Sequence, residues 1–184
     1  MAHYQVFHPD HEVIGQIALE IQTAIGGENI YPIYERHGLT NVNPRAWYPM
    51  QNLLDVFNDF EARGGAMFDL VSVGMKTVEN LVLPPEASNF HLLEMFQLSA
   101  QIYLLNSRGS NIGTIDCEAL APTHVKLTYI VPMPSDFMYG IVYAFGRRFS
   151  VPGTPITVYY DEDIPRREDG GAATIIHARW KPQR

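Results

Sequence analysis

The spacing of apolar residues changes near Asn111 and divides the chain into two halves. Before this point apolar side chains recur every three or four positions, which is typical of amphipathic helices. Gly and Pro residues separate the periodic stretches and indicate where each helix ends. The pattern predicts helices over His11–Ile25 (capped by Asp10 and ended by Gly26-Gly27), 30–36, 50–63 (opened by Pro49 and ended by Gly64-Gly65), 67–81 and 88–105.

The stretch Ser88–Leu105 is expected to be the central helix. It follows Pro84-Pro85, and Ser88 or Asn89 is a suitable N-cap. Its apolar residues cover more than one face, which favours a helix surrounded by other elements. One titratable ring, His91, lies in its first turn.

After Asn111 the pattern alternates, as expected of strands with one buried face. Strands are predicted over 113–120, 124–131, 154–163 and 172–180, with a polar turn at 164–171. Between the second and third strands, Ser135 caps a helix that ends with Arg147-Arg148. The predicted class is α+β in one domain, residues 1–184: a helical N-terminal half without strands, then a four-stranded antiparallel sheet with one crossing helix, ββαββ.

Two features of the helical half suggest close contacts. The first helix carries a broad stripe that includes Val13, Ile17, Ile21 and Ile25, so it packs on the domain body or on a partner subunit. We expect a homodimer on this basis. Gly74 lies in mid-helix, where glycine costs about 1 kcal/mol relative to alanine, and this indicates close approach by a neighbouring helix or by a ligand.

Composition excludes several classes of function. The 184 residues carry a net charge of −7, which argues against nucleic acid or an anionic membrane as a partner. A single cysteine, Cys117, permits no internal disulfide and no cysteine-based zinc site. No apolar run approaches the ~18–20 residues of a transmembrane helix, and the N-terminus lacks the layout of a signal peptide. A cytoplasmic protein is expected.

Candidate catalytic groups are not found at productive spacings, and a non-enzymatic role is therefore predicted. The chain has no phosphate-binding glycine loop and no nucleophile elbow. Cys117 falls in mid-strand and is interpreted as a buried structural thiol. Asp161, Glu162 and Asp163 are interpreted as a solvated strand end. His3, His8 and His11 are assigned to a mobile terminus.

The order of elements and the segment VGMKTVENLVLPPEASNFHLLEM resemble the heme nitric-oxide/oxygen-binding (H-NOX) domains. The C-terminal part, from MPSDFMYGIVYAFGRRF to ATIIHARW, is similar to the 4-vinyl-reductase-like domains of the same superfamily, which also includes the transport-particle (TRAPP) subunits. In the heme domains a histidine following Asn-Phe is the proximal iron ligand. The resemblance places His91 of Asn89-Phe90-His91 at that position.

The resemblance implies heme as a possible cofactor and a sensor of a diatomic gas as the function. A pocket is expected between the helical half and the sheet, and its predicted lining residues are Leu70, Gly74, Phe90, His91, Met95 and Tyr129. Tyr129 matches the tyrosine of the Tyr-x-Ser-x-Arg motif that holds the heme propionates. Val131 and Met133 stand where that motif has serine and arginine, so Arg108 or Arg45 would have to substitute. The cysteine positions of the vinyl-reductase-like relatives are occupied by Ser135 and by Ile164 or Pro165.

Three functions therefore remain open. The first is a small-molecule-binding sensor domain that holds heme, an unidentified apolar ligand, or neither, and that signals to a separate protein. The second is a heme-free scaffold or assembly module of TRAPP-like fold, which acts through its surface. The third is a tetrapyrrole-modifying enzyme, which is suggested by the vinyl-reductase resemblance alone.

Overall fold

The computed structural model describes residues 3–26, 30–63, 69–81 and 90–181. Its main sheet has four antiparallel strands in the order β4-β5-β7-β6, formed by β4 (Thr114–Ala121), β5 (His124–Ile130), β6 (Ile156–Tyr160) and β7 (Thr174–Trp180). Val125, Leu127 and Tyr129 of β5 are buried on one face, whereas Lys126 and Thr128 point to the other. This alternation confirms the predicted strands and their antiparallel sheet.

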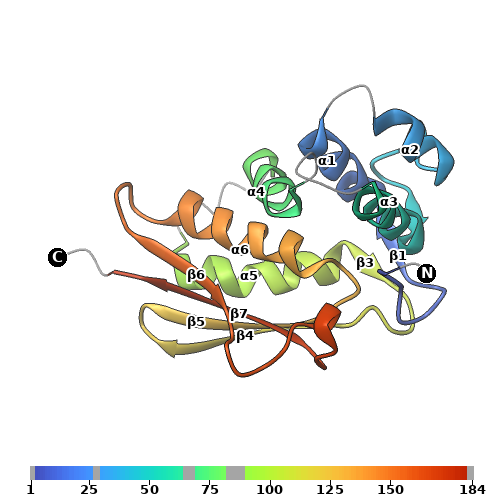
Figure 1. The fold of residues 1–184 in the computed structure, drawn as a ribbon. Helices are drawn as coiled ribbons and strands as arrows, with labels where there is room; N and C mark the ends of the chain where they lie inside the picture. The colour runs from blue at the N-terminus through green and yellow to red at the C-terminus, as the bar shows by residue number, and fades with distance from the viewer. Residues whose placement is uncertain (1–2, 27–29, 64–68, 82–89, 182–184) are drawn as a thin grey trace.

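Two helices cover the inner face of the sheet (Figure 1). These are α5 (Leu92–Leu105), which contacts β4, and α6 (Ser135–Phe149), which contacts β6 and β7. The predicted order strand-strand-helix-strand-strand is confirmed, with α6 as the crossing helix. A single turn of 3-10 helix, η3 (Arg167–Asp169), lies in the connection between β6 and β7.

The remaining helices form a layer beyond α5 and α6 (Figure 1). They are α1 (Gly15–Ile25), α2 (Tyr31–Arg36), α3 (Met50–Ala62) and α4 (Leu70–Asn80). The apolar stripe of α1 packs on α4, and its Ala18, Ile21 and Ala24 are buried. Packing on the domain body therefore accounts for the stripe, and the homodimer stays a prediction. In the described part of the chain, no helix combines the length and apolarity needed to cross a bilayer.

Helices α4 and α6 cross with their backbones in contact. A Cβ atom built on Gly74 would lie 2.2 Å from the carbonyl oxygen of Phe137. A Cβ atom built on Gly140 would lie 2.1 Å from the carbonyl oxygen of Val71. Each glycine thus makes room for the other helix, and the interpretation of Gly74 as a helix-packing residue is confirmed.

A second, short sheet corrects the prediction of a strand-free N-terminal half. Its order is β2-β1-β3, with β1 at Glu12–Ile14, β2 at Trp47–Pro49 and β3 at Ser107–Arg108. These strands have two or three residues each, too few for an alternating pattern to be recognised. The sheet ties the N-terminal segment to the end of α5.

Several predicted helix ends also need correction. The first helix begins at Gly15, because Glu12–Ile14 pair as a strand. Asp10 caps no helix; its carboxylate accepts hydrogen bonds from the backbone N–H of Ser110, at 3.0 Å, and from the Ser110 hydroxyl. Pro134 rather than Ser135 is the N-cap of α6. The expected caps Ser88 and Asn89 and the expected Gly64-Gly65 stop lie outside the described residues.

Candidate functional site

An apolar cavity of about 110 Å³ lies between the helices and the inner face of the sheet. Helices α1, α4, α5 and α6 and strands β4 and β5 all contribute to its wall. Most of the lining side chains are aliphatic, aromatic or methionine, and they include Ile17, Val78, Ile102, Ile115, Met133, Met138, Ile141 and Phe145. An interior space of this kind, between two halves of a fold, is a usual place for a small ligand.

The structure brings one of the predicted pocket residues to this cavity. Tyr129 lines it from β5, and burial raises the pKa of its phenol far above the ordinary value. Leu70 and Met95 are buried in the core, and Gly74 faces the backbone of α6. Phe90 is 39% exposed and His91 is exposed at the start of α5. The described cavity wall contains neither these two residues nor Leu70, Gly74 and Met95.

His91 acts as the N-cap residue of α5. Its backbone N–H donates a 2.7 Å hydrogen bond to the Glu94 carboxylate. This is the reciprocal half of a capping box, in which a residue of the first turn reaches back to the helix start. The contact fixes the backbone of His91 and leaves its imidazole at the surface.

Glu20 is a cavity residue that the sequence analysis missed. It lies on α1, is 8% exposed and lines the cavity. Its Oε1 atom accepts a 3.0 Å hydrogen bond from the Gln16 amide, whereas its buried Oε2 atom has no hydrogen-bond partner among the described residues. Burial raises the pKa of this carboxyl above its usual value. The sequence feature that could have pointed to Glu20 is its place inside the apolar stripe of this helix, one residue before Ile21.

Four other polar groups in the wall have hydrogen-bond partners. The Thr77 hydroxyl donates to the carbonyl oxygen of Val73 at 2.9 Å. The Tyr103 hydroxyl donates to Ile112 O at 2.5 Å, and the Asn106 amide donates to Ile102 O at 2.7 Å. The Ser99 hydroxyl donates to Phe96 O at 2.6 Å. Glu20 therefore differs from these groups in offering an unused polar atom.

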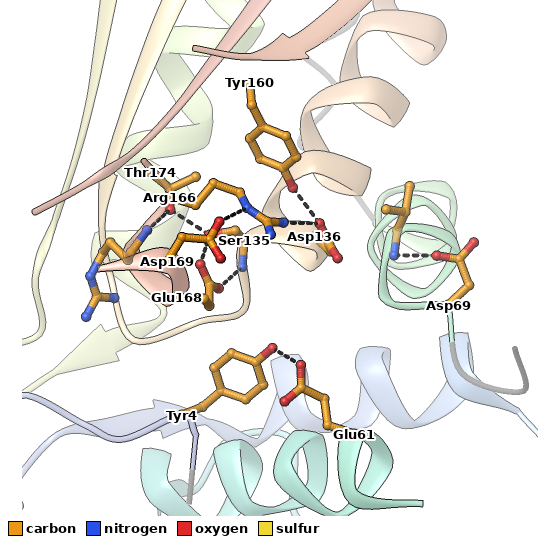
Figure 2. A network of polar contacts seen from close by, with 12 residues as sticks. Tyr4, Glu61, Asp69, Ser135, Asp136, Tyr160, Arg166, Glu168, Asp169 and Thr174 are labelled. Carbon is orange, nitrogen blue, oxygen red and sulfur yellow. Dashed lines mark hydrogen bonds and ion pairs between the residues drawn. The ribbon is translucent and has the colours of Figure 1, made fainter. Parts of the chain in front are cut away.

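A polar network holds the start of α6 to the β6–β7 connection (Figure 2). The Glu168 carboxylate accepts hydrogen bonds from the backbone N–H of Ser135, at 2.5 Å, and from the Ser135 hydroxyl. That hydroxyl also contacts Thr174 Oγ1 at 2.6 Å. The arrangement places a carboxylate at the positive end of a helix, which stabilises the helix. We assign this network a structural role, because its contacts join the first residue of α6 to the β6–β7 connection and to β7.

Beside this network, Arg166 bridges two carboxylates (Figure 2). It pairs with Asp136 at 3.1 Å and with Asp169 at 2.8 Å. Tyr160 donates a 2.7 Å hydrogen bond to Asp136. These contacts anchor the polar turn after β6 to the first turn of α6.

The outer face of the sheet carries a small histidine cluster. His124 Nε2 lies 2.9 Å from His177 Nδ1, and His177 Nε2 lies 3.1 Å from an Asp161 oxygen. The Tyr159 ring stacks on His177 with centroids 5.0 Å apart. Asp161 is therefore part of this cluster, whereas Glu162 is exposed as predicted. Among the described residues, no group of three His, Cys, Asp or Glu side chains could hold a metal ion.

Two further sequence interpretations concern single residues. Cys117 is partly buried, and burial raises its pKa to about 11, so it is a thiol at neutral pH.

His11 is 1% exposed and both ring nitrogens lack a partner among the described residues, which corrects its assignment to a mobile terminus. Burial lowers the pKa of His11 and keeps the ring neutral. His11 is not among the described residues that line the cavity.

Several solved structures of similar fold are H-NOX proteins. An oxygen-binding H-NOX domain related to soluble guanylate cyclases, in its oxygen complex, has a TM-score of 0.68 at 13% identity over 91% of this chain and 93% of that one. An H-NOX protein from S. oneidensis, a mutant in the Fe(II) ligation state, has a TM-score of 0.66 at 13% identity over 93% of this chain and 97% of that one. The chain has the H-NOX fold.

A mutant of the T. tengcongensis H-NOX gives a similar result, with a TM-score of 0.64 at 13% identity over 90% of this chain and 96% of that one. No protein-family model matches the sequence, and no curated protein matches it. The likeness therefore lies in the arrangement of the elements.

The H-NOX fold raises the question of whether the residues present fit heme. Heme iron is held by an axial side chain such as histidine, and propionates need cationic or hydrogen-bonding partners. Among the described residues that line the cavity there is no histidine, cysteine, lysine or arginine, and the one ionisable carboxyl, Glu20, would repel a propionate. The cavity is also smaller than the ~300–1,000 Å³ of pockets for larger ligands. The cavity as described does not fit the group.

Proposed function

We propose that this chain is a small-molecule-binding sensor domain of H-NOX fold, which takes a small apolar ligand into the cavity between its helices and its sheet. The observation that carries the proposal is the apolar cavity of about 110 Å³ beside Tyr129 and Glu20. Protein interiors are otherwise close-packed, and an apolar cavity of about 150 Å³ can bind a molecule as large as benzene. The ligand state would pass to a separate signalling protein.

The proposal is tested by methyl nuclear magnetic resonance with n-pentane as the probe. Ile17, Ile102 and Ile141 line the cavity, whereas Ile33 and Ile176 are buried elsewhere. We expect n-pentane to shift the methyl signals of the first three and to leave those of Ile33 and Ile176 unchanged. The same shifts in both groups would indicate non-specific binding and would contradict the proposal.

A blocking substitution makes the test specific to this cavity. Ser99 lines the cavity from α5, and Gln101 is exposed on the same helix. Ser99→Leu should fill part of the space and abolish n-pentane binding. Gln101→Leu adds the same side chain at the surface and should leave binding unchanged. If n-pentane does not bind the unsubstituted protein, the scaffold function, in which the fold is filled by its own side chains, is the better account.

A second candidate, a heme-dependent gas sensor with His91 as iron ligand, is favoured by the H-NOX fold. It requires the exposed His91 ring to turn toward an enlarged cavity. The visible spectrum of the purified protein after incubation with hemin separates the two candidates. A Soret band that disappears in His91→Ala, but persists in His37→Ala, with unchanged far-ultraviolet circular dichroism, would establish heme binding through His91. The small-ligand proposal expects no such band.

A further inference from the structure

The unused oxygen of Glu20 gives the cavity a chemical preference. The side chain is 8% exposed, it lines the cavity, and its Oε2 atom is buried without a hydrogen-bond partner among the described residues. An unpaired buried carboxyl oxygen has lost its water without gaining another hydrogen bond, which is unfavourable. A ligand that donates a hydrogen bond to this atom would remove that cost.

No described residue of the cavity wall supplies a cation to this carboxyl. The described residues of the cavity wall include no lysine, arginine or histidine. The Gln16 amide on the same helix contacts the other oxygen, Oε1, and is neutral. A charge that pairs with an ionised Glu20 therefore has to come from the guest.

We infer that the ligand is a small primary amine with an apolar body, whose ammonium group donates to Glu20 Oε2 while its hydrocarbon part fills the cavity. This inference rests on the proposed function, because it names the ligand class of the same cavity. Charge-assisted hydrogen bonds are about twice as strong as neutral ones. A buried ion is tolerated when an opposite charge is paired with it, which disfavours an anionic ligand here.

Size and surroundings restrict the class further. An apolar cavity of about 150 Å³ holds benzene, so about 110 Å³ suits a guest of roughly five heavy atoms. Phe137, Phe145 and Tyr103 line the same space, and aromatic faces attract an ammonium ion. n-Butylamine meets both conditions, and n-pentane has the same length without the charge.

The test measures binding of n-butylamine and n-pentane at pH 7.4 by methyl nuclear magnetic resonance. It uses the unsubstituted protein, Glu20→Gln and the matched control Glu35→Gln, which changes an exposed carboxylate of α2. We expect Glu20→Gln to weaken n-butylamine binding at least about tenfold and to change n-pentane binding less than about twofold. Glu35→Gln should bind both probes as the unsubstituted protein does. Glu20→Leu replaces Glu20→Gln if the latter does not fold.

The possible outcomes distinguish a failure of the amine inference from a failure of the proposed function. If n-pentane binds while n-butylamine does not, the amine inference is overturned and the proposed function stands. The same holds if the Glu20 variant binds n-butylamine as tightly as the unsubstituted protein does. If neither probe shifts the cavity methyl signals, the proposed function fails as well. Binding of n-butylamine that depends on Glu20 supports both.

Discussion

Gly74→Ala tests the contact between α4 and α6 most directly. The added Cβ atom would lie 2.2 Å from the carbonyl oxygen of Phe137, which is backbone and has no rotamer to change. To reach an ordinary contact distance the two helices must separate by about 1 Å. The substitution therefore weakens the packing along the whole helix crossing and not only at one side chain.

Two opposing effects set the magnitude. Alanine is favoured over glycine in a helix interior by about 1 kcal/mol. Overpacking of a close-packed interior costs about 1–3 kcal/mol, and the separated helices also lose contacts around the crossing. We expect Gly74→Ala to lower the free energy of unfolding by about 1–2 kcal/mol, so that the steric effect exceeds the gain in helix propensity.

Guanidinium denaturation followed by tryptophan fluorescence measures this change. Trp180 reports on the sheet and core, because its ring lies 5.9 Å from that of Phe96. The matched control is Gly146→Ala on α6, where the added Cβ would lie 2.8 Å from Ile156 Cγ2, a side-chain methyl group rather than backbone. Gly146→Ala should destabilise the protein less than Gly74→Ala does, because a side chain can shift where a backbone carbonyl cannot, and the gain in helix propensity offsets part of the cost. A Gly74→Ala protein as stable as the unsubstituted one would refute the backbone contact.

Three further changes address other parts of the structure. Burial raises the pKa of Glu20 in the folded protein, so as pH rises above about 4.5 this carboxyl ionises first in the unfolded chain, and the free energy of unfolding falls until the folded-state pKa is passed. Glu20→Gln should remove this fall. Urea titrations at pH 4 and pH 7 measure it, and the same pH dependence in both proteins would contradict the expectation. Glu168→Gln weakens the acceptor at the start of α6 and should lower the free energy of unfolding by about 1 kcal/mol, measured against the exposed-site control Glu35→Gln. Light scattering of the intact protein tests the expected homodimer, and a monomer mass would reject it.

The periodicities that predicted the fold come from long elements. Residues of β5 alternate strictly and those of α3 follow a helical stripe, because each buries one face over several turns or residues. The strands Glu12–Ile14 and Trp47–Pro49 were missed because three residues give no period. Their pairing depends on residues far apart in the chain, which no local pattern records.

The candidate site was harder to predict than the fold. Tyr129 lines the cavity from the apolar face of its strand, and a strand's face can be read from its alternating pattern. Whether Phe90 and His91 point inward depends on where α5 begins, and the helix starts after both of them. Glu20 was missed because the sequence pattern around an acid in an apolar stripe is the same whether the side chain faces a cavity or the edge of the core.

The crossing at Gly74 and Gly140 also determines which walls of the cavity can yield. Thr77 and Val78 of α4 and Ile141 of α6 lie within one or two turns of the crossing, and there backbone rests on backbone. The two backbones cannot move closer or slide there without a clash, so this wall resists displacement as a unit. Helix α1 is held in the same way at its start, since a Cβ built on Gly15 would lie 2.1 Å from the carbonyl oxygen of Asn43. The more compliant wall is α5, which contains no glycine and meets the cavity through side chains such as Ile102. A guest larger than the cavity would therefore displace α5 before it displaces α4, α6 or the start of α1.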